Sequence, residues 1–326
     1  MFALLVATAI GYSNGVNAQQ PKMYFSDSTG TGVFLAKDPV VVKFKGRYLM
    51  YYSRKLSYDT NNGMLGWNIG IAESKDLYQW TKIAEIKPEK EYEQKGLCAP
   101  GAMIIKGQVH LFYQTYGNGP KDAICHAIAD DGIHFTRDES NPIFHPSGAW
   151  TNGRAIDAEV ALFNHRYFLY FATRDSTGTI QKQGVATAKE STDFSRQQWQ
   201  QATDSSILQP TLSWEGKCVE GASVINHKGT LYMFYAGSYN NEPQQIGVAM
   251  SKDGIEWKRL SDQPFLANGK PGSWNSSESG HPCIFRDDNG DTYLFYQGNN
   301  DKGRSWYLSN LKIGWNNKGP YIIPGQ

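Results

Sequence analysis

The chain has 326 residues, of which 40% are hydrophobic and 19% charged, so it carries enough apolar material for a large folded domain. Its formal net charge of +1 lacks the basic excess that nucleic-acid binding requires. Aromatic residues make up 13% of the chain, and because Tyr and Trp favour strands, we expect most of them to fill β-sheets.

The N-terminus reads as a signal peptide. An apolar run from Phe2 to Ile10 precedes Val16-Asn17-Ala18, a small-x-small pattern that signal peptidase recognises. The run is too short to cross a bilayer, and no other stretch could cross one. The basic residues that usually begin a signal peptide are missing, and a buried N-terminal strand is the alternative. We therefore expect a signal peptide over residues 1–18, a single domain over residues 19–326, and a secreted or periplasmic protein without a membrane partner.

A strand–turn–strand unit recurs five times after this segment. In each copy an apolar strand leads into a tight turn, and an aromatic-rich strand follows. The turns and second strands read KGRYLMYYS from Lys45, KGQVHLFYQ from Lys106, NHRYFLYFA from Asn164, KGTLYMFYA from Lys228 and NGDTYLFYQ from Asn289. A third strand follows each unit, as in NIGIAESKD from Asn68, although the fifth copy, from Ser305, is degenerate. A short fourth strand is expected near Trp80, Phe135, Trp199 or Trp257.

The spacing of the turns identifies the architecture. Gly46, Gly107, His165, Gly229 and Gly290 are separated by 61, 58, 64 and 61 residues. About sixty residues holding four antiparallel strands make one propeller blade. A β-sandwich would not repeat this signature five times, and no long run of helical period supports an α/β fold. The sequence predicts an all-β protein, a five-bladed β-propeller.

Ionisable residues stand at the start of most inner strands. Counting back eight residues from the first three turns gives Asp38, Ala99 and Asp157; counting back nine in the last two, where the hairpin reads as one residue longer, gives Glu220 and His281. Inner strands of all blades line the propeller axis, so these side chains should converge. A carboxylate is costly to bury, and three together would push their pKa values apart. A single acid of this kind usually caps a strand or binds an ion; three in register favour catalysis.

The order of these motifs resembles glycoside hydrolase family 43, the five-bladed arabinanases, arabinofuranosidases and β-xylosidases. The resemblance runs from about Val33 to the end of the chain. It implies a general base at Asp38 in KDP, a carboxyl that orients the acid and raises its pKa at Asp157 in IDA, and a general acid at Glu220 in VEG. It also implies hydrolysis with inversion, without a cofactor for the chemistry. Ala158 departs from the usual IDP motif.

The resemblance implies further site residues. The family often has a fifth-blade His beside a hydrated Ca²⁺, which His281 in SGHP matches; a structural His, or a His bonded to Asp38 or Asp157, are the alternatives. Gly303-Arg304 resembles a substrate-contacting pair of the same blade. Glu159 should share a face with Asp157 by strand alternation, as a substrate contact or an ion-pair partner of Arg154.

Aromatic and basic residues near the inner strands are candidate sugar contacts. We select Trp67 in GMLGWNIG first, then Phe34, with Arg154 and Arg304 as hydroxyl donors. Trp150, Trp214 and Trp274 are expected to pack between blades unless they form stacking walls. Loops 57–65, 87–97 and 268–279 are expected to wall the cavity.

The expected function is cleavage of arabinose- or xylose-containing carbohydrates by a monomer, first as an α-L-arabinofuranosidase. A β-xylosidase, an endo-arabinanase and a non-catalytic carbohydrate-binding propeller are the alternatives. Fructan-cleaving propellers are disfavoured because FLAKDP stands where their Trp-Met-Asn-Asp-Pro motif would be, and mannoside phosphorylases because no basic phosphate cluster is evident. The four cysteines, Cys98, Cys125, Cys218 and Cys283, have no zinc-site spacing, and either buried thiols or a disulfide would fit.

Overall fold

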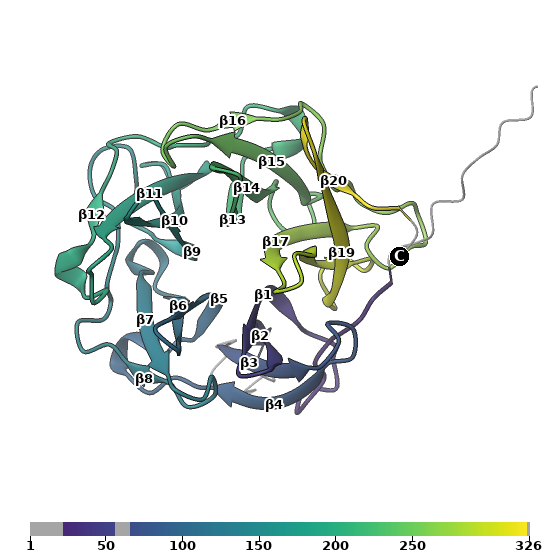
Figure 1. Cartoon of the computed structure of the whole chain (residues 1–326), viewed down its shortest axis with the longest axis horizontal. Coiled ribbons are helices and arrows are strands. Elements are labelled where there is room, and N and C mark those ends of the chain that lie inside the picture. The colour runs from purple at the N-terminus through teal and green to yellow at the C-terminus, as the bar shows by residue number, and fades with distance from the viewer. Residues whose placement is uncertain (1–21, 56–65, 325–326) are drawn as a thin grey trace, which may run out of the picture.

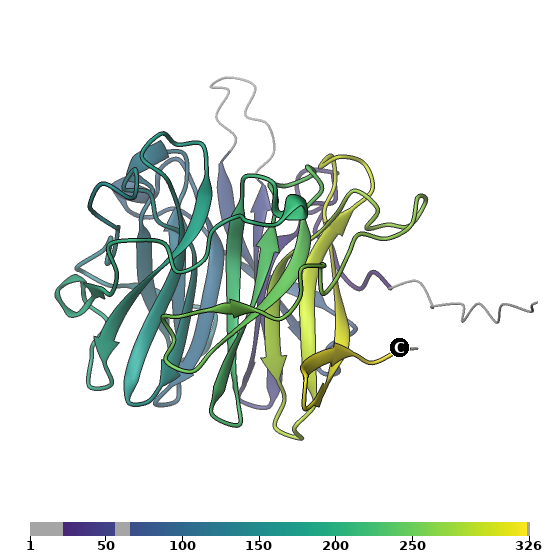
Figure 2. The ribbon, with the colours of Figure 1, turned by 90° about the horizontal axis from the view of Figure 1, so that it is seen from above.

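Five antiparallel four-stranded sheets surround a central axis in the computed structural model, which describes residues 22–55 and 66–324 (Figure 1). Each sheet is built from consecutive strands, and its first strand lies nearest the axis. The view from the side shows the strands running between the two faces of the ring (Figure 2). The predicted five-bladed propeller with four strands per blade is confirmed.

The blades follow one another in chain order. Blade 1 contains β1 (Lys37–Phe44), β2 (Arg47–Lys55), β3 (Trp67–Ser74) and β4 (Thr81–Ile86). Blade 2 contains β5 (Leu97–Ile105), β6 (Gln108–Thr115), β7 (Ile124–Ala129) and β8 (Thr136–Arg137). Blade 3 contains β9 (Ile156–Phe163), β10 (Arg166–Arg174), β11 (Gln181–Lys189) and β12 (Gln200–Gln201). Blade 4 contains β13 (Val219–His227), β14 (Thr230–Gly237), β15 (Gln245–Ser251) and β16 (Lys258–Arg259). Blade 5 contains β17 (Glu278–Arg286), β18 (Thr292–Asn299), β19 (Tyr307–Asn316) and β20 (Gly319–Ile322). Short 3₁₀ helices are η1 (Glu91–Glu93), η2 (Gly119–Lys121), η3 (Arg196–Gln198) and η4 (Ser213–Glu215).

Two-residue turns join the first two strands of blades 1 to 4. In blade 1, Phe44 pairs with Arg47 across Lys45 and Gly46, which have φ of 50° and 79°. Positive φ at both central residues is the requirement of a type I′ turn, which matches the twist of a hairpin. The glycines that mark the repeat in the sequence are therefore a consequence of turn geometry.

Two adjacent aromatic residues on each second strand build the core between blades. All ten are buried, and they pack into the apolar clusters that join neighbouring blades. The pairs are Tyr51 and Tyr52, Phe112 and Tyr113, Tyr170 and Phe171, Phe234 and Tyr235, and Phe295 and Tyr296. Aromatic residues bury large areas, so this repeated pair accounts for much of the aromatic content.

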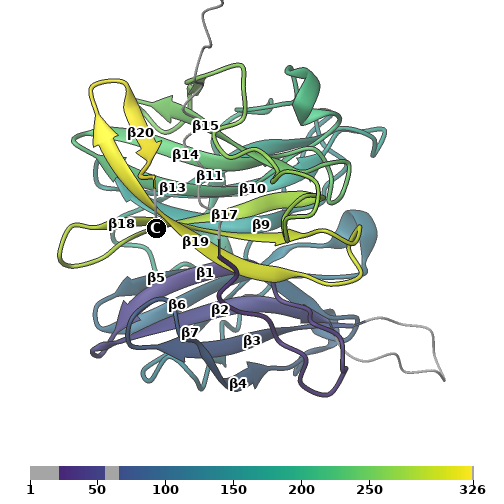
Figure 3. The same cartoon turned by 90° about the vertical axis from the view of Figure 1, so that its right-hand side faces the viewer.

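The ring closes where the first and last blades meet. Residues that precede β1 run beside β19, with Phe25 bridged to Leu308 and Leu35 to Trp306 (Figure 3). The Phe25 and Leu308 backbones exchange N–H···O bonds of 3.1 and 2.8 Å. The N-terminal segment therefore fastens blade 5 to blade 1.

The remaining sequence predictions about the chain have mixed outcomes. The predicted signal peptide lies outside the described residues. Among the described residues, no helix is long and apolar enough to span a membrane. All four cysteines are buried free thiols, as one of the two predictions had it. The fourth strands of blades 2, 3 and 4 are only two residues long, and each follows directly after the predicted aromatic residue.

Candidate active site

Each innermost strand carries a β-bulge at its start. The register with the second strand breaks at the same place in all five blades. The first residue of each bulge has a left-handed backbone, with φ between 41° and 57°: Asp38, Ala99, Asp157, Gly221 and His281. Non-glycine residues rarely adopt this conformation, and bulges re-aim side chains toward functional sites.

Blade 4 corrects the register predicted from the sequence. Gly221, eight residues before its turn, occupies the bulge position that Asp38 occupies in blade 1, and Glu220 precedes it. Glu220 therefore corresponds to Lys37, and the blade 4 hairpin is no longer than the first three. Only blade 5 has a longer turn, because Arg286 pairs with Thr292. Glu220 still reaches the axis from its own position.

The preceding blade holds the backbone N–H group of three of these bulges. Gln297 of blade 5 accepts a hydrogen bond from Asp38 N at 2.8 Å, and Gln114 of blade 2 accepts one from Asp157 N at 2.8 Å. Ser53 does the same for Ala99. A bulge leaves a backbone donor without a ladder partner, and a buried donor needs one. Two of the acids are therefore oriented by blades other than their own.

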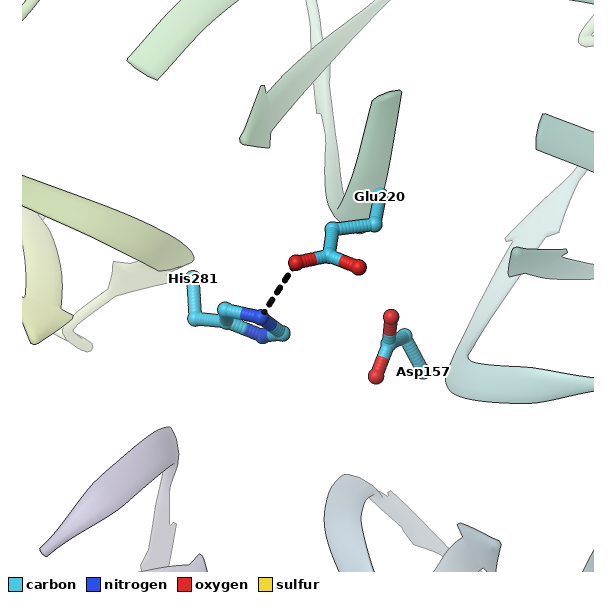
Figure 4. A group of neighbouring side chains, drawn as sticks. All are labelled: Asp157, Glu220 and His281. Carbon is cyan, nitrogen blue, oxygen red and sulfur yellow. Dashed lines mark hydrogen bonds and ion pairs between the residues drawn. The ribbon is translucent and has the colours of Figure 1, made fainter. Parts of the chain in front are cut away.

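His281 connects two of the predicted catalytic acids. Its Nε2 atom lies 3.1 Å from Glu220 Oε1, and its Nδ1 atom lies 3.1 Å from Asp38 Oδ1. Asp157 faces Glu220 and His281 from the third blade (Figure 4). The structure thus brings together all four residues that the sequence placed on the axis. The sequence allowed a hydrogen bond from His281 to Asp38 or Asp157, but the ring forms its hydrogen bond with Glu220. Its Nδ1 atom approaches Asp38 Oδ1 as an ion pair without a hydrogen bond.

The pKa values of His281, Asp157 and Glu220 shift in different directions, because each side chain has different neighbours. The two neighbouring carboxylates favour the charged ring over the cost of burial and raise the pKa of His281 to about 10. Burial, with the charges of Glu220 and Asp38, raises the pKa of Asp157 to about 7. Burial alone would raise the pKa of Glu220, but the hydrogen bond and charge of His281 outweigh it and lower that pKa.

This differs from the prediction that the acidic neighbourhood keeps Glu220 protonated. Asp157, with a pKa raised to about 7, is the member whose carboxyl gains or loses a proton near neutral pH. Glu220 is instead held as a carboxylate by donors that the sequence did not reveal: Gln244 Nε2 donates to Oε1 at 2.7 Å, and Gln181 Nε2 donates to Oε2.

Asp157, Glu220 and His281 each offer one ligand atom within 4.8 Å of the others, so this group could hold a metal ion. Direct ligation of calcium by the His281 ring does not fit its contacts, whereas the predicted contact through water stays a prediction. Both ring nitrogens face carboxylates, and a protonated imidazole has no lone pair for a metal. Calcium also prefers oxygen ligands. A small axial cavity of about 30 Å³ lies beside the bulges, lined by Asp38, Asp157, Glu159 and His281 among others.

A larger cavity of about 290 Å³ adjoins the same acids, and we call it the substrate cavity. Trp67 and Arg154, two of the predicted substrate contacts, line it. Arg304 and Phe34 are exposed and are not among its lining residues, so these two predictions are not supported. Phe34 instead packs on Tyr307, with ring centroids 5.7 Å apart.

Glu159 does not pair with Arg154. Its carboxyl accepts hydrogen bonds from Val224 N at 2.8 Å and Ser223 Oγ at 3.3 Å, both in blade 4. The bulge at Asp157 interrupts the strand alternation on which the prediction rested, and burial raises the pKa of Glu159 to about 7. Arg154 pairs with Asp122, at 3.4 Å.

The substrate cavity has further lining residues that the sequence did not reveal, most of them on second strands or in the loops that follow these strands. Lys37 lies between the rings of Trp67 and Trp306, 5.5 and 5.0 Å from their centroids, and 3.9 Å from Asp38 Oδ1. The other unexpected lining residues include Gln114, Tyr116, Arg174, Gln181, Tyr239, Asn240 and Asn241. Gln114 lies as far after the turn of its blade as Gln297 and Ser53 lie after theirs. Counting forward from the repeated turns would therefore have found it.

Three of the tryptophans and two of the loops considered in the sequence analysis lie outside the substrate cavity. Trp214 stacks on Tyr235, Trp274 lies against Tyr296, and Trp150 against Phe171, which confirms the packing alternative. Residues 87–97 and 268–279 do not line the substrate cavity, and loop 57–65 lies outside the described residues.

Three carboxyl groups from separate blades, oriented beside a cavity lined by tryptophan, tyrosine and amide side chains, define a glycoside hydrolase. Residues 33–319 match the model of the glycosyl hydrolases family 43, and the chain belongs to this family. Its substrate is accordingly a carbohydrate.

Solved structures share the fold at low sequence identity. A thermostable family-43 glycoside hydrolase is 19% identical, with a TM-score of 0.71 over 93% of this chain and 96% of that one. An endo-1,4-beta-xylanase from Bacteroides thetaiotaomicron is 20% identical, with a TM-score of 0.70 over 91% and 96%. An alpha-L-arabinofuranosidase from Lactobacillus brevis is 16% identical, with a TM-score of 0.66 over 88% and 94%. No curated protein sequence matches the chain.

Proposed function

We propose that the protein is an inverting glycosidase that removes arabinose or xylose residues from plant carbohydrates, and first of all an α-L-arabinofuranosidase. The observation that carries the proposal is the contact of one imidazolium with Asp38 on one side and Glu220 on the other. Similarity to an arabinofuranosidase and a xylanase supports the sugar class, with β-xylosidase as the alternative.

In the proposed reaction Asp38 is the general base and Glu220 the general acid. Asp38 takes a proton from the water that attacks the anomeric carbon, and Glu220 gives one to the departing oxygen. Asp157, whose pKa is raised to about 7, is partly protonated near neutral pH and lies beside Glu220. We propose that substrate binding, which excludes water from both carboxyls, moves this proton to Glu220 before bond cleavage.

Inversion is part of the proposal because the chain belongs to a family of inverting enzymes. Inverting enzymes hold their two carboxyl groups roughly 6.5–9.5 Å apart, and retaining enzymes roughly 5–5.5 Å apart. The His281 ring lies 3.1 Å from a carboxyl oxygen of Asp38 and 3.1 Å from one of Glu220, so the two acids approach the site from opposite sides of this ring.

Two variants and a substrate series test the assignment. On aryl α-L-arabinofuranosides and β-xylosides, Asp38→Asn should lower kcat by about 10²–10⁴ with every leaving group. Glu220→Gln should show its largest loss with poor leaving groups and a small loss with dinitrophenolate, which departs without a proton. Exposed Glu190→Gln serves as the matched control. Proton NMR of the first released sugar should show the inverted anomer; retention, or full activity of Asp38→Asn, would refute the proposal.

A further inference from the structure

One arginine of the substrate cavity has no carboxylate to balance it. Arg174 ends β10, and its Nε atom donates to Gln181 Oε1 at 3.2 Å. Its guanidinium lies 5.6 Å from the centroid of the Tyr239 ring. Within the described residues it forms no ion pair. Asp175, its neighbour in sequence, accepts hydrogen bonds from the backbone N–H groups of Thr179 and Ile180 instead.

The other cationic residues of the cavity are compensated. Lys37 lies 3.9 Å from Asp38, Arg154 lies 3.4 Å from Asp122, and His281 contacts both Asp38 and Glu220. Four basic side chains line the cavity against three acidic ones, Asp38, Asp157 and Glu220. The charge without a partner is therefore that of Arg174.

Contacts place Arg174 on one side of the reaction centre. Gln181 accepts from Arg174 through Oε1 and donates to Glu220 through Nε2. Asp38, in contrast, enters from blade 1 on the far side of the His281 ring. If Glu220 is the general acid, as proposed above, the sugar beside Arg174 is the one that leaves, because the acid protonates the oxygen of the leaving group.

We propose that Arg174 binds a carboxylate on the leaving-group sugar, so that the enzyme prefers linkages to a uronic acid. A guanidinium presents paired N–H donors that match the two oxygens of a carboxylate. Among the described residues, the guanidinium of Arg174 donates only from Nε, to Gln181, so its two terminal NH₂ groups have no protein acceptor. The proposal rests on the assignment of Glu220. It names a substrate class for the same site: neutral pentose on one side of the scissile bond, anionic sugar on the other.

Binding tests the proposal without turnover. Calorimetry on the intact protein would compare methyl galacturonoside and methyl glucuronoside with their methyl esters, which keep the ring and lose the charge. At least one free acid should bind roughly tenfold to a hundredfold more tightly than its ester, the range of a charge-assisted hydrogen bond. Added salt should reduce the difference. Equal binding of acids and esters would overturn the proposal.

Substitutions at Arg174 test whether this residue causes the preference for the free acid over the ester. Arg174→Met should bring the acid-to-ester ratio near one, and Arg174→Lys, which keeps the charge without the fork, should leave part of it. Arg166→Met, at the exposed opposite end of β10, is the control and should keep the wild-type ratio. An unchanged ratio in Arg174→Met would overturn the proposal. If Arg174→Met does not fold, the Arg174→Lys ratio decides, and an unchanged ratio there would also overturn it.

Kinetics separate this proposal from the proposed reaction. The wild type should hydrolyse arabinosyl-galacturonic or arabinosyl-glucuronic acid with a higher kcat/KM than the corresponding methyl ester. Hydrolysis of acid and ester at equal rates would reject the carboxylate site and leave the glycosidase assignment intact. If neither substrate nor any aryl glycoside is cleaved, yet the acid binds through Arg174, the carboxylate site stands and the proposed reaction fails.

Discussion

Replacing His281 with Gln would test whether a charged ring holds the two acids together. A pKa raised from 6.5 to about 10 corresponds to about 5 kcal/mol of favourable interaction between the ring proton and its surroundings. Removing one partner of a buried ion pair costs about 3–5 kcal/mol, because the remaining charge must take up a proton or stay unpaired. We therefore expect the free energy of unfolding of His281→Gln to fall by about 3–5 kcal/mol at pH 7.

The loss should depend on pH in a defined direction. Below pH 6.5 the ring is protonated in both the folded and the unfolded chain, so its stabilisation is fully present; it declines as the pH rises toward 10. Between pH 7 and pH 5 this effect changes the stability of the wild type by less than about 1 kcal/mol, because pH 7 is close to 6.5. In the variant, the buried carboxyls of Asp157 and Glu220 lack the counter-charge and take up protons, which adds about 1.4 kcal/mol per proton for each pH unit toward acid and outweighs the first effect. The deficit of the variant should therefore be smaller at pH 5 than at pH 7.

Urea unfolding followed by tryptophan fluorescence measures both effects. His134→Gln is the control, because exposed His134 also contacts a carboxylate, Asp131, at 2.6 Å, and exposed pairs contribute about 0–1 kcal/mol. In the wild type, nitrogen NMR should find both ring nitrogens of His281 protonated and without titration from pH 5.5 to 8.5. A neutral ring at pH 7, or a loss in His281→Gln no larger than in His134→Gln, would refute the reasoning.

Three further predictions concern the cavity, the metal and the core. Trp67→Ala should raise KM more than it lowers kcat, because the ring lines the cavity without contacting the acids; a pure kcat loss would contradict this. Treatment with a chelator should leave the melting temperature and rate unchanged, since His281 is engaged by carboxylates, and a drop reversed by Ca²⁺ would show that the assignment of His281 is wrong. Arg137→Met should lower stability by about 3–5 kcal/mol by leaving buried Glu93 without its ion pair, and Glu93→Gln in the same chain should restore part of it; thermal melts showing no change would reject this.

The repeat made the fold predictable. Tight turns with positive φ, which carry glycine in blades 1, 2 and 4 and Asn164-His165 in blade 3, are local requirements, as are the aromatic second strands. Their spacing therefore appears directly in the sequence. The positions of Asp38, Asp157 and His281 followed from the same count. Glu220 was found by a count one residue too long, because a bulge cannot be distinguished from a longer hairpin in sequence letters.

The surroundings of the acids were not predictable in the same way. Gln181 reaches Glu220 from the start of β11 in blade 3, and Gln244 from the residue just before β15 in blade 4. Polar side chains at strand ends are common without function. Arg304 and Phe34 were selected from motif position alone, and the path of the loop around them leaves both exposed. The pKa order of Glu220 and Asp157 depends on which of them the ring of His281 touches, which no spacing reveals.

The bond between Asp38 N and Gln297 has a consequence for biosynthesis. Residue 38 is among the first of the domain to leave the ribosome, and residue 297 among the last. During translation the first acid therefore has no partner for its bulge until the final blade has been made. A chain that stops after four blades would contain Asp38, Asp157 and Glu220 but lack Gln297 and His281, so Asp38 and Glu220 would be without the blade 5 contacts that orient them in the finished fold.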